Sequence, residues 1–179
     1  MPGFFNKLLG KDPEGRARSV QVLANLDSAS SIPKLITALG DEAVEVRRAA
    51  ASALEPHGRT GDADAITALT TALNDKDAEV RKAAALSLGG FVPVSAGSTE
   101  SVKAKEALIK ILEKEGDTGV LNNLVLALAQ IQDPAMIKPM VEALGPKDKK
   151  VIGMAIDAID NLPATDIRID MKKGLRSIL

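Results

Sequence analysis

The chain has 179 residues, 45% hydrophobic and 26% charged, which is enough apolar material for one folded domain with a sizeable core. A net charge of −1 argues against a general polyanion-binding protein, and the absence of cysteine excludes disulfides, thiolate catalysis and cysteine-bound zinc. Aromatic residues make up only 2%, so Ala, Leu, Ile and Val must fill the core, which favours closely packed helices.

The N-terminal segment, residues 1–11, places Phe4, Phe5, Leu8 and Leu9 on one side of a short helix. We expect it to cap the end of the fold, with docking to a membrane surface or a partner as the alternative. It lacks the long apolar region of a signal peptide, and no apolar run reaches the roughly 18 residues that a membrane span needs. We therefore expect a cytoplasmic protein with no transmembrane segment.

Residues 12–162 contain a repeated helical phrase. The phrase EVRRAAASAL at 45–54 recurs as EVRKAAALSL at 79–88, and looser copies begin at Glu14, Gly119 and Lys150. The copies align five residues at one position, at steps of 31 to 40 residues: Arg16, Arg47, Arg81, Leu121 and Ile152. Seven residues later each copy has a large aliphatic residue: Leu23, Leu54, Leu88, Leu128 and Ile159. We call these segments the second-type helices.

A first type of helix alternates with them. The phrase IPKLITALG at 32–40 is nearly repeated as IKPMVEALG at 137–145, with looser variants at 64–73 and 105–112. Both types have apolar residues at helical spacing and no strand-like alternation. The turns supply caps, Gly or Asn after the first type and Asp before the second: Gly40, Asn74 and Gly145; Asp41, Asp77, Asp117 and Asp148.

Each unit is thus a helical hairpin that can bury its apolar face only against the next hairpin. We predict an all-α fold, a right-handed α-solenoid of about five hairpins, as a single domain over 1–179. The turn-rich stretch 89–98 is predicted to be an inserted loop. A closing helix within 163–179 would bury Ile167, Met171, Leu175 and Ile178. Its charged residues would face solvent: Asp166, Arg168, Asp170, Lys172, Lys173 and Arg176.

The phrase DAEVRKAAALSLG at 77–89 resembles the short HEAT-like repeats first described in phycobilisome lyase subunits. The resemblance covers roughly residues 12–162 and implies a HEAT-like fold. The family's Val-Arg pair is present at 46–47 and 80–81, but becomes Val-Leu at 120–121 and Val-Ile at 151–152. Because the family's roles range from chromophore attachment to scaffolding, an accessory subunit of a lyase-type enzyme is one function that the resemblance implies.

Catalytic and metal-binding patterns are missing from the sequence. His57 is the only histidine, so a histidine-based metal cluster is excluded, and its position in the stretch 56–63 suggests a solvated loop residue. Carboxylate pairs such as Asp62 with Asp64 fall in turns, where helix capping explains them. We expect no catalytic residue, no cofactor and no metal, and therefore not an enzyme.

The repeated arginines Arg16, Arg47 and Arg81 allow two interpretations. They could form a structural ladder, each guanidinium bridging carboxylates or carbonyls of neighbouring repeats. They could instead form a row of anion contacts, for example to phosphate. We do not expect nucleic-acid binding, because the excess positive charge and the stacking aromatic residues are both missing.

The resemblance implies that the second-type helices line the concave face of the solenoid. Six residues are predicted to point outward there and to bind a partner: Arg48, Ser52, Lys82, Leu86, Asn122 and Leu126. The two leucines would form an apolar anchor with a polar rim. Alternatively, the inserted loop covers them or the helices roll and bury them.

The helix at 120–131 has aliphatic residues on nearly all sides, which calls for additional covering. The inserted loop, a partner or a second copy of the chain could supply it, and homodimerisation is the resulting hypothesis. The predicted function is a non-catalytic protein–protein interaction or scaffold module. The alternatives are an accessory subunit of a lyase-type enzyme, or phosphate or nucleic-acid binding through the arginine rows.

Overall fold

The computed structural model describes residues 12–26, 29–58, 62–91, 97–147, 149–161 and 165–179. These residues form ten α-helices, two short 3-10 helices and no strand. The α-helices are α2 (Pro13–Asn25), α3 (Ile32–Ala38), α4 (Val44–Gly58), α5 (Ala63–Ala72), α6 (Ala78–Phe91), α7 (Thr99–Lys114), α8 (Thr118–Ile131), α9 (Ile137–Leu144), α10 (Lys149–Asp160) and α11 (Asp166–Arg176). The 3-10 helices, Ala29–Ser31 and Pro134–Met136, precede α3 and α9. The predicted N-terminal cap, residues 1–11, lies outside the described residues.

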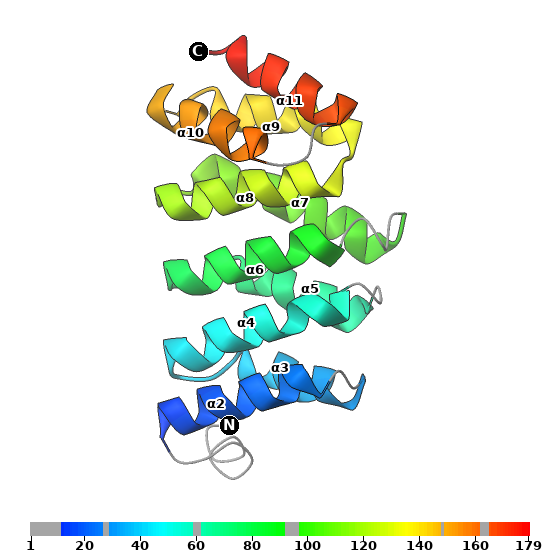
Figure 1. Ribbon diagram of the computed structural model, residues 1–179, viewed down its shortest axis with the longest axis vertical. Coiled ribbons are helices and arrows are strands. Elements are labelled where there is room, and N and C mark those ends of the chain that lie inside the picture. The colour runs from blue at the N-terminus through cyan, green and yellow to red at the C-terminus, as the bar shows by residue number, and fades with distance from the viewer. Residues whose placement is uncertain (1–11, 27–28, 59–61, 92–96, 148, 162–164) are drawn as a thin grey trace.

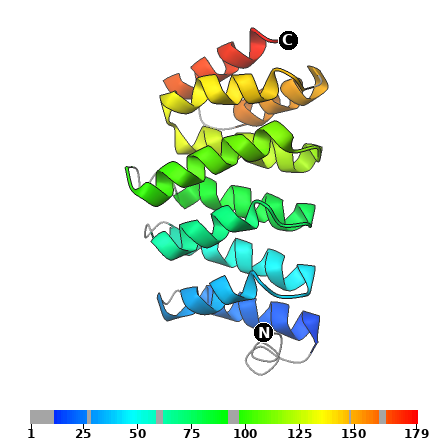
Figure 2. The same ribbon diagram turned by 180° about the vertical axis from the view of Figure 1, so that it is seen from behind.

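The helices form two layers that run along one axis. The even layer consists of α2, α4, α6, α8 and α10, which face the viewer in Figure 1. The odd layer consists of α3, α5, α7, α9 and α11, which face the viewer in Figure 2. Within each layer every helix packs against the next in sequence order. The predicted α-solenoid is confirmed, with four complete hairpins between a single helix at each end.

The core lies between the two layers and is aliphatic. The odd layer contributes fully buried residues such as Leu35, Leu69 and Leu108. The even layer contributes the large aliphatic residues predicted seven positions after the repeated arginine, and of these Leu54, Leu88, Leu128 and Ile159 are buried. Each hairpin therefore adds equivalent aliphatic side chains to one continuous core, as stacked repeats require.

The even layer is closely packed because small residues face the preceding helix. Ala53, Ser87, Ala127 and Ala158 occupy equivalent positions and are all buried. Ser87 Oγ donates a hydrogen bond of 2.9 Å to the carbonyl of Ala51, which joins α6 to α4. A Cβ atom on Gly89 would lie only 2.8 Å from the Cα of Ala127, so no side chain fits between α6 and α8 there.

Two predicted loops begin later than expected. Helix α6 continues through Phe91, three residues into the stretch 89–98, because Gly89 serves close helix packing and not a turn. Helix α4 continues through Gly58, so the backbone of His57 lies in the last helical turn and not in a loop.

The closing helix α11 packs on α9 and α10. Met171 and Leu175 are fully buried and Ile167 is half-buried, as the pattern predicts. The prediction that Arg168 faces solvent is wrong, because this residue is only 7% exposed. Its Nε donates to the carbonyl of Ala129 at 3.4 Å, in the last turn of α8, where carbonyls lack helical partners.

The aliphatic residues of α8 are covered within the chain. Helices α6, α7 and α10 all pack against α8, which bears eight buried residues. The aliphatic composition of α8 therefore requires no further covering by a second copy of the chain. Homodimerisation itself stays a prediction.

Candidate protein-binding surface

The repeated arginines form a ladder between hairpins. Arg16 Nε and Nη2 each donate to a carboxylate oxygen of Asp41 at 2.9 Å. Arg47 donates in the same two-pronged way to Asp75 at 2.8 and 3.0 Å. Arg81 donates to Glu115 at 2.8 and 3.1 Å. Each acceptor lies in the turn of the following hairpin, so every pair joins consecutive repeats.

The remaining donors of two of these forks bind the preceding turn. Arg47 Nη1 donates to the carbonyls of Asp41 and Glu42, both at 3.0 Å. Arg81 Nη1 donates to the carbonyls of Asp75 and Lys76 at 3.0 and 3.2 Å. The carboxylate partner of each fork raises the pKa of its arginine above the ordinary value. These guanidinium groups are therefore occupied by the protein itself, which supports the structural interpretation over a row of anion contacts.

The acceptor carboxylates also organise the turns. Burial would raise the pKa of Asp75, but the Arg47 hydrogen bond and the backbone N–H of Asp77 hold that pKa below its ordinary value. Glu115 behaves in the same way through Arg81 and the N–H of Asp117. Asp41 is the equivalent of these two acceptors. As predicted, Asp41 also accepts a backbone N–H in the turn before α4, because its Oδ1 accepts from Ala43 at 2.9 Å.

The ladder ends at α8. Leu121 and Ile152 take the arginine position in α8 and α10, and both are buried. In the turn before α10, Lys147 Nζ donates to the carbonyls of Glu113 and Glu115 at 2.8 Å each, which joins this turn to the preceding one. At the arginine position the C-terminal hairpins therefore have apolar contacts in place of charged forks, and Lys147 joins their turns.

The six predicted partner-binding residues all lie on the even layer and all retain contact with solvent. Leu86 is 40% exposed, and Arg48 and Ser52 are also exposed. Lys82, Asn122 and Leu126 are half-buried. Neither leucine is therefore a core residue, as the alternative of rolled helices would require. Part of the inserted loop, residues 92–96, lies outside the described residues.

An open groove of about 440 Å³ crosses the even layer between α8 and α10. It is lined by Thr118, Gly119, Asn122 and Leu126 from α8, and by Met154, Asp157, Ala158 and Asn161 from α10. Two of the six predicted residues, Asn122 and Leu126, therefore lie in it. The wall from α10 was missed, although Met154 replaces the small residues Ala49 and Ala83 of earlier repeats.

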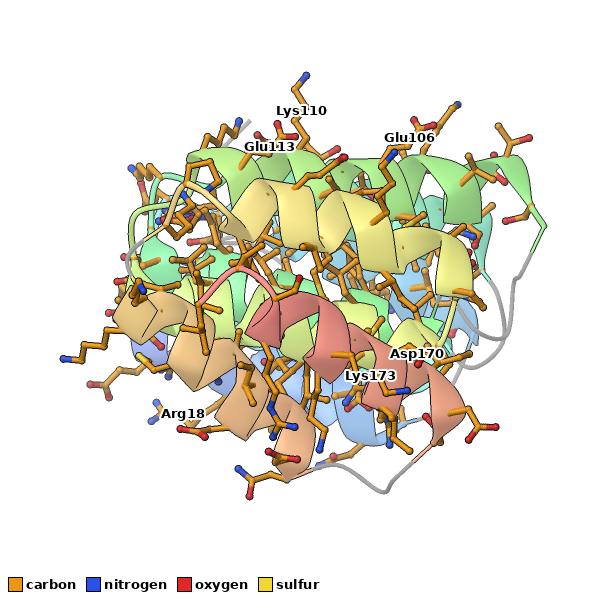
Figure 3. All side chains as sticks on the ribbon, turned by 90° about the horizontal axis from the view of Figure 1, so that it is seen from above. Arg18, Glu106, Lys110, Glu113, Asp170 and Lys173 are labelled. Carbon is orange, nitrogen blue, oxygen red and sulfur yellow. The ribbon has the colours of Figure 1, made fainter. Side chains whose placement is uncertain are left out.

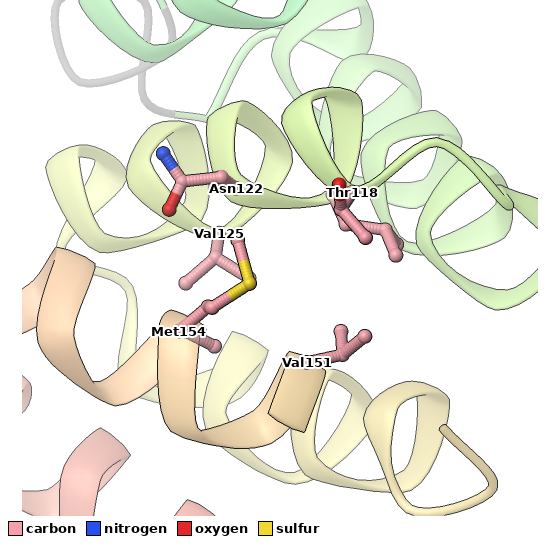
Figure 4. A pocket seen from close by; sticks show the side chains of 7 residues that line it. Thr118, Asn122, Val125, Val151 and Met154 are labelled. Atoms are coloured by element: carbon pink, nitrogen blue, oxygen red, sulfur yellow. The ribbon is translucent and has the colours of Figure 1, made fainter. Parts of the chain in front are cut away.

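Next to the groove, apolar side chains of α8 and α10 fill the space between the two helices. Figure 4 shows Met154 pointing from α10 toward Val125 of α8, with Val151 farther along α10. The crevice between these residues has no room for a water molecule. The groove is thus a surface feature above a packed interface, and it does not lead into the core.

The groove is open because α8 lacks the charged pair that covers this face in α6. Lys82 Nζ forms an ion pair with Glu79 at 2.7 Å, whereas the equivalent residues of α8 are Asn122 and Gly119. No charged residue occurs between Thr118 and Ile131. A Cβ on Gly119 would lie 2.5 Å from Cε of Lys82, so the lysine stem occupies the space that a side chain would need.

The outer face of the odd layer differs in character. Figure 3 shows Glu106, Lys110 and Glu113 of α7 pointing away from the stack. Charges of both signs alternate there, which is typical of a solvated face. Among the described residues, no three His, Cys, Asp or Glu side chains are grouped to hold a metal ion. Within the described part of the chain, no helix has the length and apolar character needed to cross a membrane.

Comparisons with known proteins agree on the fold. Residues 1–89 match the family described as HEAT repeats. A crystal structure of an engineered protein matches with 24% identity over 98% of this chain and 96% of its own, at a TM-score of 0.54. A second engineered protein matches with 20% identity over 97% and 98%, at a TM-score of 0.57.

The complex of CpcE and CpcF of phycocyanin lyase from Nostoc sp. matches with 19% identity over 98% of this chain and 93% of its own, at a TM-score of 0.46. Identities this low show similarity of fold alone. A search of curated proteins finds no significant match. The family match covers the N-terminal repeats, and hairpins of the same kind continue to α11. The N-terminal half of the chain therefore consists of HEAT repeats, and the hairpins that follow continue the same fold.

Proposed function

We propose that this protein is a non-catalytic interaction or scaffold module that binds a partner protein on the exposed face of the even layer. HEAT repeats suggest such a role in general. The observation that carries the proposal here is the groove between α8 and α10, with half-buried Leu126 in its wall and exposed Leu86 on the next helix.

The packing of the layers supports the even face as the inner one. Helices of the even layer pack against one another more extensively than helices of the odd layer do. A stack that is tighter on one side curves toward that side. A partner lying on the even face would therefore contact several hairpins at once, as solenoid proteins commonly allow.

The side chains on this face have the composition of a binding site. Leu86 and Leu126 occupy equivalent positions on neighbouring helices, where the repeats before and after have Gln21, Ser52 and Asp157. Polar groups that can make hydrogen bonds surround the two leucines, among them Lys82 and Asn122. An apolar centre with a polar rim is the usual anatomy of a protein interface.

The other candidate functions have less support. Phosphate or nucleic-acid binding through the arginine rows would need free guanidinium donors, and the forks of Arg47 and Arg81 bind carboxylates and carbonyls of the chain. A role as an accessory subunit of a lyase-type enzyme rests on the sequence resemblance alone.

A double variant, Leu86→Ser with Leu126→Ser, tests the proposal. The matched control is Val102→Ser with Ile169→Ser, because these odd-layer residues are 44% and 41% exposed, close to the 40% of Leu86. Both double variants lose two surface aliphatic residues, but only the first alters the proposed site. Partners captured from lysate by each form are then quantified by mass spectrometry.

We expect the Leu86 and Leu126 variant to lose at least tenfold in capture of partners that the wild type and the control both retain, since anchor residues dominate interface energy. Circular dichroism should show unchanged helicity in both variants. Equal capture by all three forms would contradict the proposal. Unfolding of the first variant alone would show that the leucines stabilise the fold, which would also contradict it.

A further inference from the structure

The groove between α8 and α10 has a chemistry that specifies its ligand more closely than a general interaction surface does. We infer that it binds a peptide segment of a partner in which an aliphatic side chain stands next to a lysine or arginine. This inference rests on the proposed function and names the partner chemistry of the same site.

Helix α8 carries no charged side chain beside the groove. In α4 and α6 the outward positions near the start of the helix have Glu45 with Arg48 and Glu79 with Lys82. The equivalent positions in α8 have Gly119 and Asn122, so no ionic side chain of this helix reaches across the groove. An apolar group can therefore enter without removing water from a charged group of α8, which would be costly.

The α10 wall of the groove contributes one charged side chain, that of Asp157. Among the described residues that line the groove, Asp157 is the only ionisable one, and it is exposed. Its carboxylate forms no ion pair with any residue in the described ranges. Asp160, one turn further along α10, forms an ion pair with Lys172 of α11. This lysine is therefore already engaged and does not neutralise Asp157.

Helix α10 strengthens this negative end. Asp157 and Asp160 both lie in its last turn, which contains no basic residue. The free carbonyls at a helix C-terminus carry partial negative charge and attract cations. A lysine or arginine of a partner is therefore favoured at this end of the groove, and an acidic segment is disfavoured.

The groove also has apolar surface for an aliphatic side chain of the partner. Leu126, Met154 and Ala158 form the apolar part of the wall, and the unbranched methionine can adapt to different side-chain shapes. A volume of about 440 Å³ accommodates one or two such groups. The Asn122 amide makes no hydrogen bond within the described part of the chain, so it can both donate to and accept from a peptide backbone.

The test uses a random 12-residue peptide library displayed on phage, selected in parallel on the wild-type protein and on Asp157→Lys. We expect the wild type to enrich peptides with an aliphatic residue adjacent to Lys or Arg. Asp157→Lys should enrich an aliphatic residue adjacent to Asp or Glu. The exchange of sign follows from electrostatic complementarity, which chiefly sets specificity.

A wild-type-selected peptide is then synthesised and titrated against variants. Asp157→Asn should weaken binding about fivefold at low salt, and high salt should reduce this difference because exposed charges are screened. Asp64→Asn, an exposed acid in the first turn of α5, is the matched control and should bind like the wild type. Leu126→Ser should abolish binding.

The outcomes separate the inference from the proposed function. Peptides that need Leu126 but show no preference for basic residues would overturn the inference and leave the binding surface standing. Peptides indifferent to both Leu126 and Asp157 would overturn both. The inference would also be overturned if no peptide is enriched more strongly on the wild-type protein than on Asp157→Lys.

Discussion

The two halves of the stack solve the same packing problem with different chemistry. From α2 to α7, consecutive hairpins are joined by buried arginine–carboxylate forks, and charged side chains cover the even face. From α8 onward, Leu121 and Ile152 replace the arginines, and α8 carries no charge at all. Helix α10 packs on α8 less extensively than α8 packs on α6.

The comparison indicates how a repeat protein can separate stability from recognition. A bidentate fork sets the distance between two hairpins geometrically, because its donors and acceptors match only in one orientation. An apolar contact permits more variation in spacing, and here the less extensive contact lies beneath the open groove. The N-terminal half is the more strictly specified, and the C-terminal half offers the surface for a ligand.

The largest effect is expected from breaking the ladder at its centre. Arg47→Ala would leave Asp75 partly buried without its cation and would free two backbone carbonyls of the turn. Breaking a buried pair in this way typically costs about 3–5 kcal/mol, and we expect about 3 kcal/mol in the free energy of unfolding by urea titration. The neighbouring Arg48→Ala is the control and should change stability by less than about 0.5 kcal/mol. Equal losses in the two variants would contradict the ladder's role.

A smaller loss is expected from separating α6 and α8. Gly89→Ala would place a Cβ 2.8 Å from the Cα of Ala127, which is backbone and cannot rotate away. Overpacking of this kind costs about 1–3 kcal/mol, so we expect a lower melting temperature by differential scanning calorimetry. An unchanged melting temperature would show that the two helices can move apart freely.

These positions also show how far the sequence predicts the structure. The hairpins follow from spacing, because each residue recurs where the fold requires it. Spacing also places the arginines at one repeated position, but the choice between a ladder and anion contacts requires their partners Asp41, Asp75 and Glu115. The packing role of Gly89 and the burial of Arg168 do not follow from spacing, since both depend on how closely two distant segments approach. The sequence predicts part of the groove. Asn122, Leu126 and Asp157 lie in the aligned outward rows, whereas Met154 and Ala158 lie outside these rows and reach the groove through the way α10 packs on α8.

Acid should weaken the ladder of the N-terminal half. The folded-state pKa values of Asp75 and Glu115 lie below their ordinary values, so the unfolded chain binds more protons as the pH falls below about 4–5. The stability that these carboxylates contribute is present above their unfolded pKa values and is lost as the pH falls through the folded ones. We expect the loss to be smaller than that of Arg47→Ala, because a protonated acid can still accept a hydrogen bond.

Thermal melts between pH 7 and pH 2.5 measure this effect. The variant Asp75→Asn with Glu115→Gln should start less stable at pH 7 and show a shallower decline on acidification than the wild type. Parallel declines would mean that carboxylates elsewhere in the chain control acid unfolding. Hydrogen exchange on the same samples should show α4 and α6 losing protection before α8 does.

The smallest effect is a gain, expected at a helix position where an added side chain meets open space. A Cβ on Gly153, in the interior of α10, would meet no atom within 4 Å, in contrast to one on Gly89. Gly153→Ala should therefore stabilise the protein by about 0.5–1 kcal/mol, because alanine restricts the unfolded chain and suits a helix. Urea titration of this variant alongside Gly89→Ala compares an open position on α10 with a packed position between α6 and α8. A loss of stability at both positions would show that a side chain at residue 153 meets atoms of a neighbouring helix, so that this side of α10 is as closely packed as the contact between α6 and α8.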